Sequence, residues 1–163
     1  MTDYLPAPSD DVWVVETPDD LEDLAEHLGR SKRIALDIEA NSLHAYRERV
    51  CVLQVTSEGR HAIIDSVALT DLGPLRDAFD REDLLVLFHG GDYDIAMLSR
   101  DHDFAFHRVF DTMIASTILG EEKLGLANLV LDAYGVDLDK RYQKADWARR
   151  PLQDDQIDYL YRD

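Results

Sequence analysis

Four carboxylates in this chain, one of them paired with a tyrosine, have the types and positions needed to hold divalent cations. Asp37 and Glu39 lie in an apolar segment, Asp94 begins a predicted helix, and Tyr159 and Asp163 stand four residues apart at the end of the sequence. Carboxylate oxygens are the hard ligands that Mg²⁺ and Mn²⁺ prefer. Acids placed in this way at the ends of regular elements predict metal-assisted cleavage of phosphodiesters.

The first two acids share one face of a predicted strand. In residues 34–39 apolar side chains alternate with Ala35, Asp37 and Glu39, so both carboxylates point the same way. Neighbouring carboxylates repel each other and lose hydration on burial, and a bound cation would compensate for both effects. In a chain with 34 acidic residues, an acidic strand face that meets water is the alternative.

The third acid, Asp94, follows a strand end and the glycine turn Gly90-Gly91. In the first turn of a helix, the helix dipole favours the charged form of a carboxyl group. Asp92 is the better candidate for capping this helix, and Asp94, which lies further inside it, is the better ligand. The alternative is that Asp94 only caps the helix.

The remaining candidates also have structural alternatives. Tyr159 and Asp163 would share one face of a helix, as residues of any amphipathic helix do. His89, at a strand end, could be a hydrogen-bonded structural histidine. Asp111, which precedes an apolar helical run, is most simply a helix cap.

The hydrophobic pattern predicts that strands come first and helices follow. Strands are expected at residues 12–15, 34–39, 50–56, 61–65 and 84–88. Helices are expected at residues 18–28, 72–79, 93–99, 112–119, 126–134 and 152–163. This order favours a mixed sheet covered by helices.

Composition limits the class of protein. A chain of 163 residues with 45% apolar residues is long enough for one domain with its own core. Its single cysteine, Cys51, lies in an apolar run, which predicts a buried thiol and a reducing cytoplasm. No leader peptide and no membrane span are expected.

The net charge of −17 is extreme. This charge repels nucleic acid at long range. Bound cations and local basic residues can nevertheless make the electrostatic potential positive where a substrate binds. Adaptation to a salty cytoplasm is another interpretation of this acidic composition. The one concentrated basic stretch, residues 137–151, is either a solvated loop or a contact for substrate phosphates.

Taken together, the motifs resemble the RNase D family, which belongs to the DEDDy 3′-5′ exonucleases of the DnaQ-like group. The resemblance runs from about residue 12 to the end, and the motifs occur in the family's order. It is carried by Leu36-Asp37-Ile38-Glu39, Phe88-His89-Gly90-Gly91-Asp92-Tyr93-Asp94-Ile95, Phe110-Asp111-Thr112, the stretch from Lys144 to Leu152, and Tyr159-Leu160-Tyr161-Arg162-Asp163.

The resemblance implies roles for the five candidates. Asp37 and Glu39 form the first exonuclease motif, Asp94 supplies the acid of the second, and Tyr159 and Asp163 form the third. The four acids would hold two divalent cations, Mg²⁺ or Mn²⁺, and Tyr159 would orient the attacking water. The implied fold is RNase H-like, an α/β arrangement of three αβα layers around a central five-stranded mixed sheet.

The resemblance further implies a single exonuclease domain over residues 1–163, truncated at its C-terminus and without an accessory helical domain. The expected activity is 3′-5′ exoribonuclease, releasing nucleoside 5′-monophosphates in tRNA processing or short-RNA turnover. The alternatives are a Werner-type DNA exonuclease and a catalytically weak nuclease-fold binding module. Because Asp163 would end the last helix, weak binding of the second cation is expected. The sequence does not indicate an oligomeric state.

Substrate contacts are expected around these motifs. Leu43 and His44 follow the first motif and could stack on the terminal base, although an ordinary surface loop is equally consistent with them. Arg49 and Lys144 could contact backbone phosphates. His89 is the remaining candidate for substrate binding.

Overall fold

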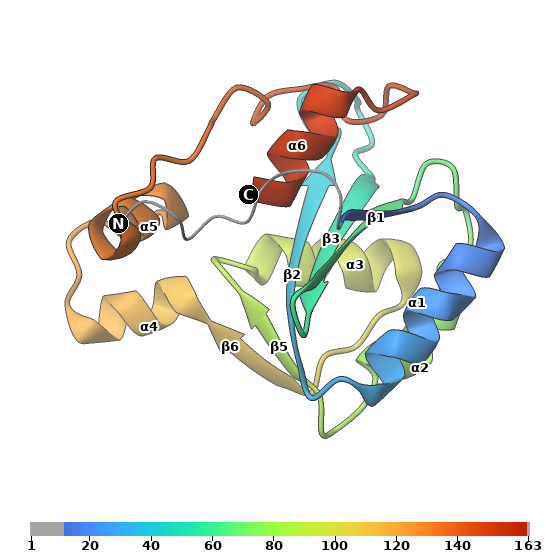
Figure 1. Ribbon diagram of the computed structural model, residues 1–163, viewed down its shortest axis with the longest axis horizontal. Helices are drawn as coiled ribbons and strands as arrows, with labels where there is room; N and C mark the ends of the chain where they lie inside the picture. The colour runs from blue at the N-terminus through green and yellow to red at the C-terminus, as the bar shows by residue number, and fades with distance from the viewer. Residues whose placement is uncertain (1–11, 163) are drawn as a thin grey trace.

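The chain forms one six-stranded mixed sheet with helices on both faces (Figure 1). The computed structural model describes residues 12–162. The strands are β1 (Val12–Val15), β2 (Arg33–Ala40), β3 (Val50–Ser57), β4 (Arg60–Asp65), β5 (Leu85–Phe88) and β6 (Arg108–Asp111). Their spatial order is β1-β4-β3-β2-β5-β6. The pairs β2–β3 and β3–β4 are antiparallel, and the other three pairs are parallel.

The helices divide between the two faces of the sheet. They are α1 (Pro18–Arg30), α2 (Gly73–Phe79), α3 (Asp92–His102), α4 (Thr112–Leu119), α5 (Leu126–Tyr134) and α6 (Asp154–Arg162). Buried side chains of α1, α2 and α3 join the larger core on one face, and α6 joins a second core on the other (Figure 1). Helices α4 and α5 have no buried residue. Among residues 12–162, no helix has the length and apolarity to cross a membrane.

The predicted fold class is confirmed, but the expected number of strands is wrong. The sequence predicted five strands, and the sixth is β6, which pairs in parallel with β5 at the edge of the sheet. Its four residues are too short to show an alternating pattern, and three of them are exposed. The exposure of β6 explains the missing signal, because a strand that buries no residue needs no run of apolar side chains, whereas the equally short edge strand β1 is an apolar run.

The central strand β2 separates the two cores. Ile34, Leu36 and Ile38 are buried in the larger core, whereas Asp37 and Glu39 lie half-buried on the opposite face. This alternation is the one that the sequence predicted. The start of β2 pairs with β5 as far as Ala35, and Asp37 and Glu39 lie on the part of the strand that pairs with β3, opposite Gln54 and Val52.

The second core covers the face that carries the carboxylates. Cys51, Val52 and Ile63 of the sheet pack there against Trp147, Leu152, Tyr159 and Leu160. Cys51 is completely buried and is a free thiol, which confirms the prediction of a core cysteine. The last predicted motif therefore lies over the same face of the sheet as the first.

Gly91, where the chain leaves β5 and enters α3, has no room for a side chain. A Cβ atom at this position would stand 2.4 Å from Cβ of the buried Phe88. A Cβ atom added at Gly29, inside α1, would have nothing within 4 Å apart from its chain neighbours and the nearby backbone of its own helix.

We therefore expect Gly91→Ala to lower the free energy of unfolding by about 1–3 kcal/mol, because Phe88 or the helix start must shift. Gly29→Ala should raise it by up to about 1 kcal/mol, because alanine favours the helix. Urea unfolding of both variants measures these changes. Equal effects of the two substitutions would contradict the close packing at Gly91.

Candidate active site

Asp37 and Asp94 bring two carboxyl groups into hydrogen-bond contact beside the central strand. Asp37 comes from β2 and Asp94 from the first turn of α3. Burial raises the pKa of Asp94 to about 6. The negative charges of Asp92 and Asp111 act in the same direction, whereas the hydrogen bond with Asp37 acts against it. In the metal-free chain below this pH, a shared proton relieves the repulsion between the two groups.

Glu39 lies two residues after Asp37 on the same face of β2 and is half-buried. Its partner across the ladder is Val52 of β3. Among residues 12–162, no three His, Cys, Asp or Glu side chains form a group ready to hold a metal ion. Asp163, the fourth predicted ligand, lies outside the described residues.

Tyr159 reaches this face of the sheet from α6 and is 3% exposed. Its ring centroid lies 5.7 Å from that of Tyr142 and 5.9 Å from that of Trp147. Val52 belongs to the same core, and residues directly opposite on neighbouring strands share a face. Tyr159 and Glu39 are therefore on the same side of the sheet, as the family resemblance requires.

Asp111 caps α4 as predicted and also holds the turn before Asp94. Its carboxylate accepts the backbone N–H groups of Met113 and Ile114 in the helix. It also accepts those of Gly90 at 3.1 Å and Gly91 at 2.8 Å. Burial alone would raise the pKa of Asp111, but these hydrogen bonds outweigh it and hold the pKa below its ordinary value of 3.8.

The second contact of Asp111 was not predicted, because it joins segments about 20 residues apart. By contrast, Asp92 was expected to cap α3, and this expectation is wrong. The N-cap of α3 is Gly91, without a side-chain hydrogen bond, and Asp92 is already inside the helix. The backbone N–H groups of Gly90 and Gly91, which precede α3, donate to the carboxylate of Asp111 instead.

His89 is fixed by a hydrogen bond of 2.8 Å between its Nδ1 and Oγ1 of Thr112. The Thr112 hydroxyl donates to the carbonyl of Phe88 at 3.0 Å, so its oxygen accepts from Nδ1–H. This contact matches the structural alternative for His89. His89 nevertheless lines the main cleft, so its role in substrate binding stays a prediction.

The main cleft has a volume of about 640 Å³ and opens on the face that carries the carboxylates. Its walls come from β2 to β5, the start of α5, the loop before α6, and α6 itself. Asp37 is the one predicted ligand among its described lining residues. Polar groups along it include Gln54, Asn128, Lys140 and Gln143. A chain entering this cleft would meet the acids at Asp37.

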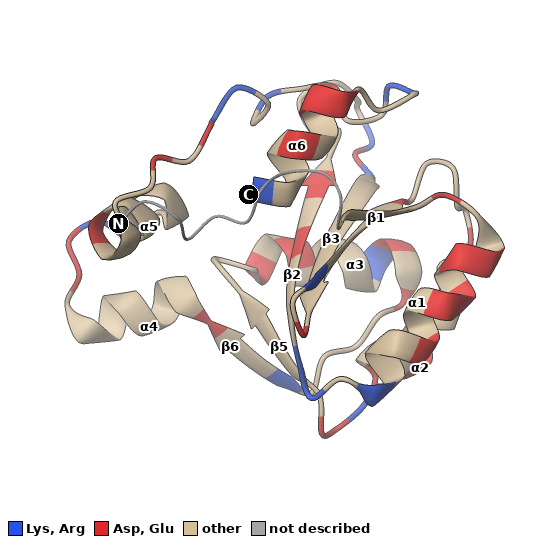
Figure 2. Ribbon diagram, viewed as in Figure 1, with Lys and Arg blue, Asp and Glu red and all other residues tan. Residues whose placement is uncertain are grey.

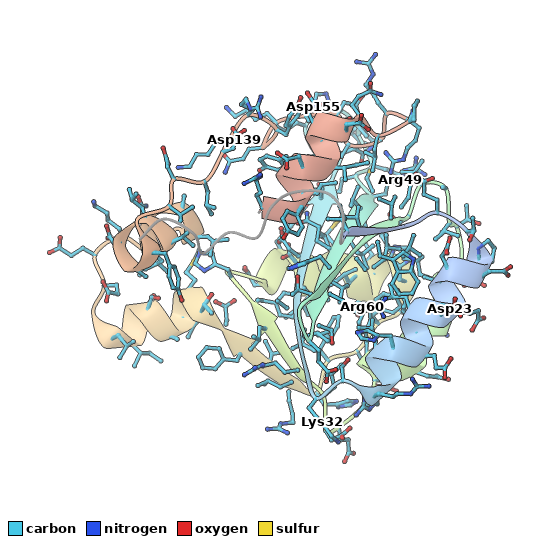
Figure 3. All side chains as sticks on the ribbon, in the orientation of Figure 1. Asp23, Lys32, Arg49, Arg60, Asp139 and Asp155 are labelled. Atoms are coloured by element: carbon cyan, nitrogen blue, oxygen red, sulfur yellow. The ribbon has the colours of Figure 1, made fainter. Side chains whose placement is uncertain are left out.

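Four predicted substrate contacts lie on two loops, the one between β2 and β3 and the one between α5 and α6. None of them lines this cleft: Leu43, His44, Arg49 and Lys144. Nε2 of His44 lies 3.1 Å from the carbonyl oxygen of Lys144, so the two loops meet. Leu43 and Arg49 are exposed (Figure 3 labels Arg49). Figure 2 shows Lys and Arg along the loop between α5 and α6 in a chain that is otherwise strongly acidic. Contacts of these four residues with a substrate stay predictions.

Solved structures place this arrangement among the DnaQ-like nucleases. The catalytic core of RRP6 from Trypanosoma brucei is 28% identical, with a TM-score of 0.84, and the match covers 98% of this chain and 47% of that chain. RNase D of Escherichia coli is 27% identical, with a TM-score of 0.85, over 92% of this chain and 40% of that chain.

The sequence pattern of a 3′-5′ exonuclease family matches residues 12–163, and the chain belongs to this family. Ribonuclease D of Sphingobium indicum is 41% identical over 139 residues, which are 83% of this chain and 36% of that protein. A Caenorhabditis elegans homolog of exosome complex component 10 is 35% identical over 151 residues, 92% of this chain and 17% of that protein. The chain thus spans little more than a third of these relatives at most, and the predicted family is confirmed.

The double role of Asp111 predicts that its removal costs more than the loss of an ordinary cap. Asp111→Ala should lower the free energy of unfolding at pH 7 by about 2 kcal/mol or more. Thr17→Ala, which removes one amide contact at the cap of α1 and an exposed hydrogen bond to the Asp20 carboxylate, should cost about 1 kcal/mol.

The cost of Asp111→Ala should also depend on pH. Because the folded pKa of Asp111 is depressed, its stabilisation is present above the unfolded-state value of about 3.9 and is lost as pH falls through the folded value. Urea unfolding at a series of pH values measures the difference. A cost that stays constant down to pH 2 would contradict this assignment.

Proposed function

We propose that the chain is a 3′-5′ exoribonuclease of the DEDDy type, which removes nucleoside 5′-monophosphates from RNA 3′ ends by metal-dependent hydrolysis. The observation that carries this proposal is the contact between Asp37 and Asp94, with Glu39 on the same face, in a member of an exonuclease family. Processing of tRNA or turnover of short RNA in the cytoplasm is the proposed role.

The residues present fit a divalent cation. The carboxyl groups of Asp37 and Asp94 meet at a half-buried place, and a cation would neutralise the negative charge that their oxygens carry when ionised. Asp37, Glu39 and Asp94 would be ligands, with Asp163 as the fourth. Mg²⁺ or Mn²⁺ ions held there, two in this proposal, would acidify a bound water and neutralise charge on the phosphate and the leaving oxygen.

The protein's own part is to bind and orient the reactants. Tyr159, fixed between Tyr142 and Trp147, directs its hydroxyl to the attacking water. The water attacks the last phosphorus of the RNA, and the bond to the 3′ oxygen of the preceding nucleotide breaks. That oxygen takes up a proton, and the released nucleotide keeps the phosphate on its 5′ carbon. The carboxylates must be ionised for this step, since they act as ligands.

RNA is favoured over DNA as the substrate by the relatives. Escherichia coli RNase D carries the description of an exoribonuclease involved in structured RNA processing, and the relatives above include a ribonuclease D. The acidic surface does not oppose this assignment, because Lys and Arg gather along the loop between α5 and α6 (Figure 2). Arg141 and Arg150 of this loop pair with Asp139 and Asp65, so Lys140, Lys144 and Arg149 are the cations proposed to meet a substrate. A DNA exonuclease and a non-catalytic binding module have no comparable support.

Asp37→Asn should abolish Mn²⁺-dependent release of nucleoside 5′-monophosphates from an RNA oligomer, with a loss of at least about 100-fold, because a ligand charge disappears. Asp23→Asn is the matched control, since Asp23 lies exposed on α1, away from the acids of β2 (Figure 3). Chromatography of the products measures both variants. Full activity of Asp37→Asn would exclude Asp37 as a ligand.

A side-by-side digestion of RNA and DNA oligomers of the same sequence tests the substrate class. The proposal expects the ratio of kcat/KM values to favour RNA, because a 2′-hydroxyl contact is what distinguishes the two sugars. A ratio in favour of DNA would support the DNA exonuclease instead. Binding of RNA without release of nucleotides would support the binding module.

A further inference from the structure

The segment that leads to Tyr159 contains turns but no helix or strand. Residues 135–153 join α5 to α6, and α6 begins only five residues before Tyr159. A connection of this length does not by itself fix the helix that follows it. Contacts between this segment and the sheet must therefore determine where α6 lies.

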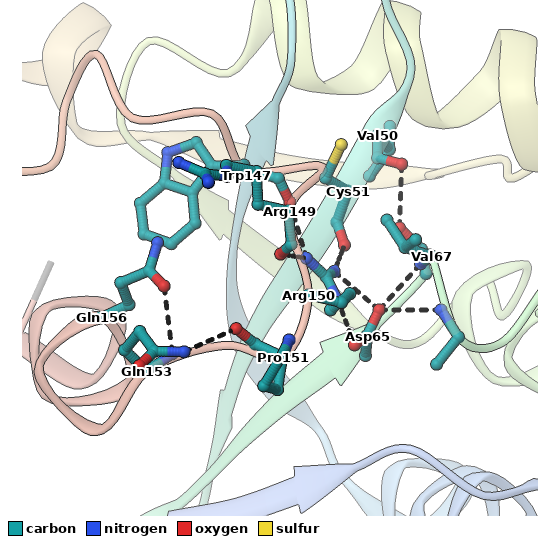
Figure 4. Close-up of polar contacts among 12 residues, drawn as sticks. Val50, Cys51, Asp65, Val67, Trp147, Arg149, Arg150, Pro151, Gln153 and Gln156 are labelled. Atoms are coloured by element: carbon teal, nitrogen blue, oxygen red, sulfur yellow. Dashed lines mark hydrogen bonds and ion pairs between the residues drawn. The ribbon is translucent and has the colours of Figure 1, made fainter.

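Arg150 provides the main contact (Figure 4). Its guanidinium forms an ion pair through Nε with Oδ2 of Asp65, and Nη2 donates to Oδ1 of Asp65 at 2.6 Å. Nη2 also donates to the carbonyl oxygen of Cys51 at 2.9 Å. Nη1 donates to the carbonyl oxygens of Trp147 at 2.7 Å and Arg149 at 2.8 Å. Every N–H group of the guanidinium thus has an acceptor.

Asp65 is a rigid acceptor for this contact. It ends β4, its side chain is 1% exposed, and its Oδ1 also accepts the N–H groups of Val67 and Ala68 at 2.9 Å (Figure 4). Burial alone would raise the pKa of Asp65, but the hydrogen bonds from Arg150 and from these two amides lower it. The carboxylate is therefore charged and immobile at neutral pH.

The contact with Cys51 falls at an irregularity of the sheet next to Glu39. Glu39 pairs with Val52 and Ala40 pairs with Val50, so Cys51 is the extra residue of a β-bulge. A bulge leaves a residue out of the ladder, and the Cys51 carbonyl is bonded to Arg150. Arg150 thus holds the bulge between β2 and β3. This bulge lies next to Glu39, a predicted metal ligand.

The hydrogen bond from Arg150 to Trp147 connects Arg150 to Tyr159, because Trp147 packs against Tyr159. Trp147 is 1% exposed, and its ring packs at 5.9 Å from the ring of Tyr159. The Arg150 guanidinium holds the backbone of Trp147 and the backbone of Cys51 at the same time. One cation therefore connects the support of Tyr159 with the strand that supports Glu39.

We propose that Arg150 is a positioning residue for hydrolysis, which holds Tyr159 in register with Glu39 by joining the Trp147 segment to the bulge at Cys51. It touches neither the substrate nor the reacting atoms. The proposal rests on the function proposed above, and it gives a role to a residue that lies within the Lys144 to Leu152 motif but was not among the predicted catalytic, metal-binding or substrate-binding residues. A displacement of Tyr159 by about 1 Å is enough to lower a rate by about 100-fold.

The test compares Arg150→Met and Arg150→Lys with Arg81→Met, all in a Trp13→Phe background, where Trp147 is the remaining tryptophan. Arg81 is a matched control. It donates to the carbonyl oxygens of Leu28, Gly29 and Ser31 and pairs with Asp83, and its side chain is 22% exposed against 20% for Arg150. It anchors the end of α1, on the other face of the sheet.

For Arg150→Met we expect kcat on an RNA oligomer with Mn²⁺ to fall about 100-fold, with KM changed by less than about threefold, per folded molecule. The emission of Trp147 should shift as its packing loosens. Arg150→Lys keeps a charge against Asp65 but cannot reach both carbonyls, so an intermediate loss of about 10-fold is expected. It also provides a readout if Arg150→Met does not fold. Arg81→Met should lower stability and leave both readouts unchanged.

A kcat of the Arg150 variants within about threefold of Arg81→Met would overturn the proposal, as would a rise in KM at constant kcat, which would indicate direct contact with RNA. If the parent chain released no nucleotides, the proposed function would fail and the role of Arg150 in hydrolysis would fail with it, and the emission of Trp147 would then test only whether Arg150 holds the Trp147 segment in place. An unchanged emission in the Arg150 variants would overturn this contact as the support of Trp147, and a shift in them but not in Arg81→Met would support it.

Discussion

The site depends on holding negative charges together that would otherwise separate. Asp37 and Asp94 meet within hydrogen-bond distance at a half-buried place, and burial raises the pKa of Asp94 to about 6. Such a pair persists only when its backbone supports are rigid. The central strand β2 has a hydrogen-bonded neighbour on each side, and the carboxylate of Asp111 ties down the turn that precedes Asp94. The unfavourable carboxyl contact is therefore stabilised by ordinary backbone hydrogen bonds.

The opposite wall of the site is held in a different way. Tyr159 lies on a helix that follows an irregular segment, so neither sheet pairing nor helix propensity fixes it. The guanidinium of Arg150 joins this segment to Asp65 and Cys51, and Trp147 fills the space up to Tyr159. Two polar anchors thus serve one site, an aspartate beside α3 and an arginine before α6. Each satisfies backbone groups that no secondary structure covers.

The features that could be predicted from the sequence are those with a pattern over a few neighbouring residues. Alternation around Asp37 located the central strand and its two faces, and the acid before an apolar run located the cap of α4. Strand β6 was missed because its four residues, three of them exposed, carry no periodicity. The contact between Arg150 and Asp65 joins residues 85 positions apart, and the contact with Cys51 spans 99. A local sequence pattern cannot indicate such a contact, because its partners come together only once the sheet has formed.

We propose that the carboxylates on β2 and α3 direct water to the last phosphodiester of an RNA chain. Digestion of a 5′-labelled RNA with Mn²⁺ in ¹⁸O-enriched water, followed by mass spectrometry, tests it most directly. We expect fragments that shorten from the 3′ end and nucleoside 5′-monophosphates that carry one solvent oxygen on the phosphate. Internal cleavage, or release of nucleoside 3′-monophosphates, would contradict it.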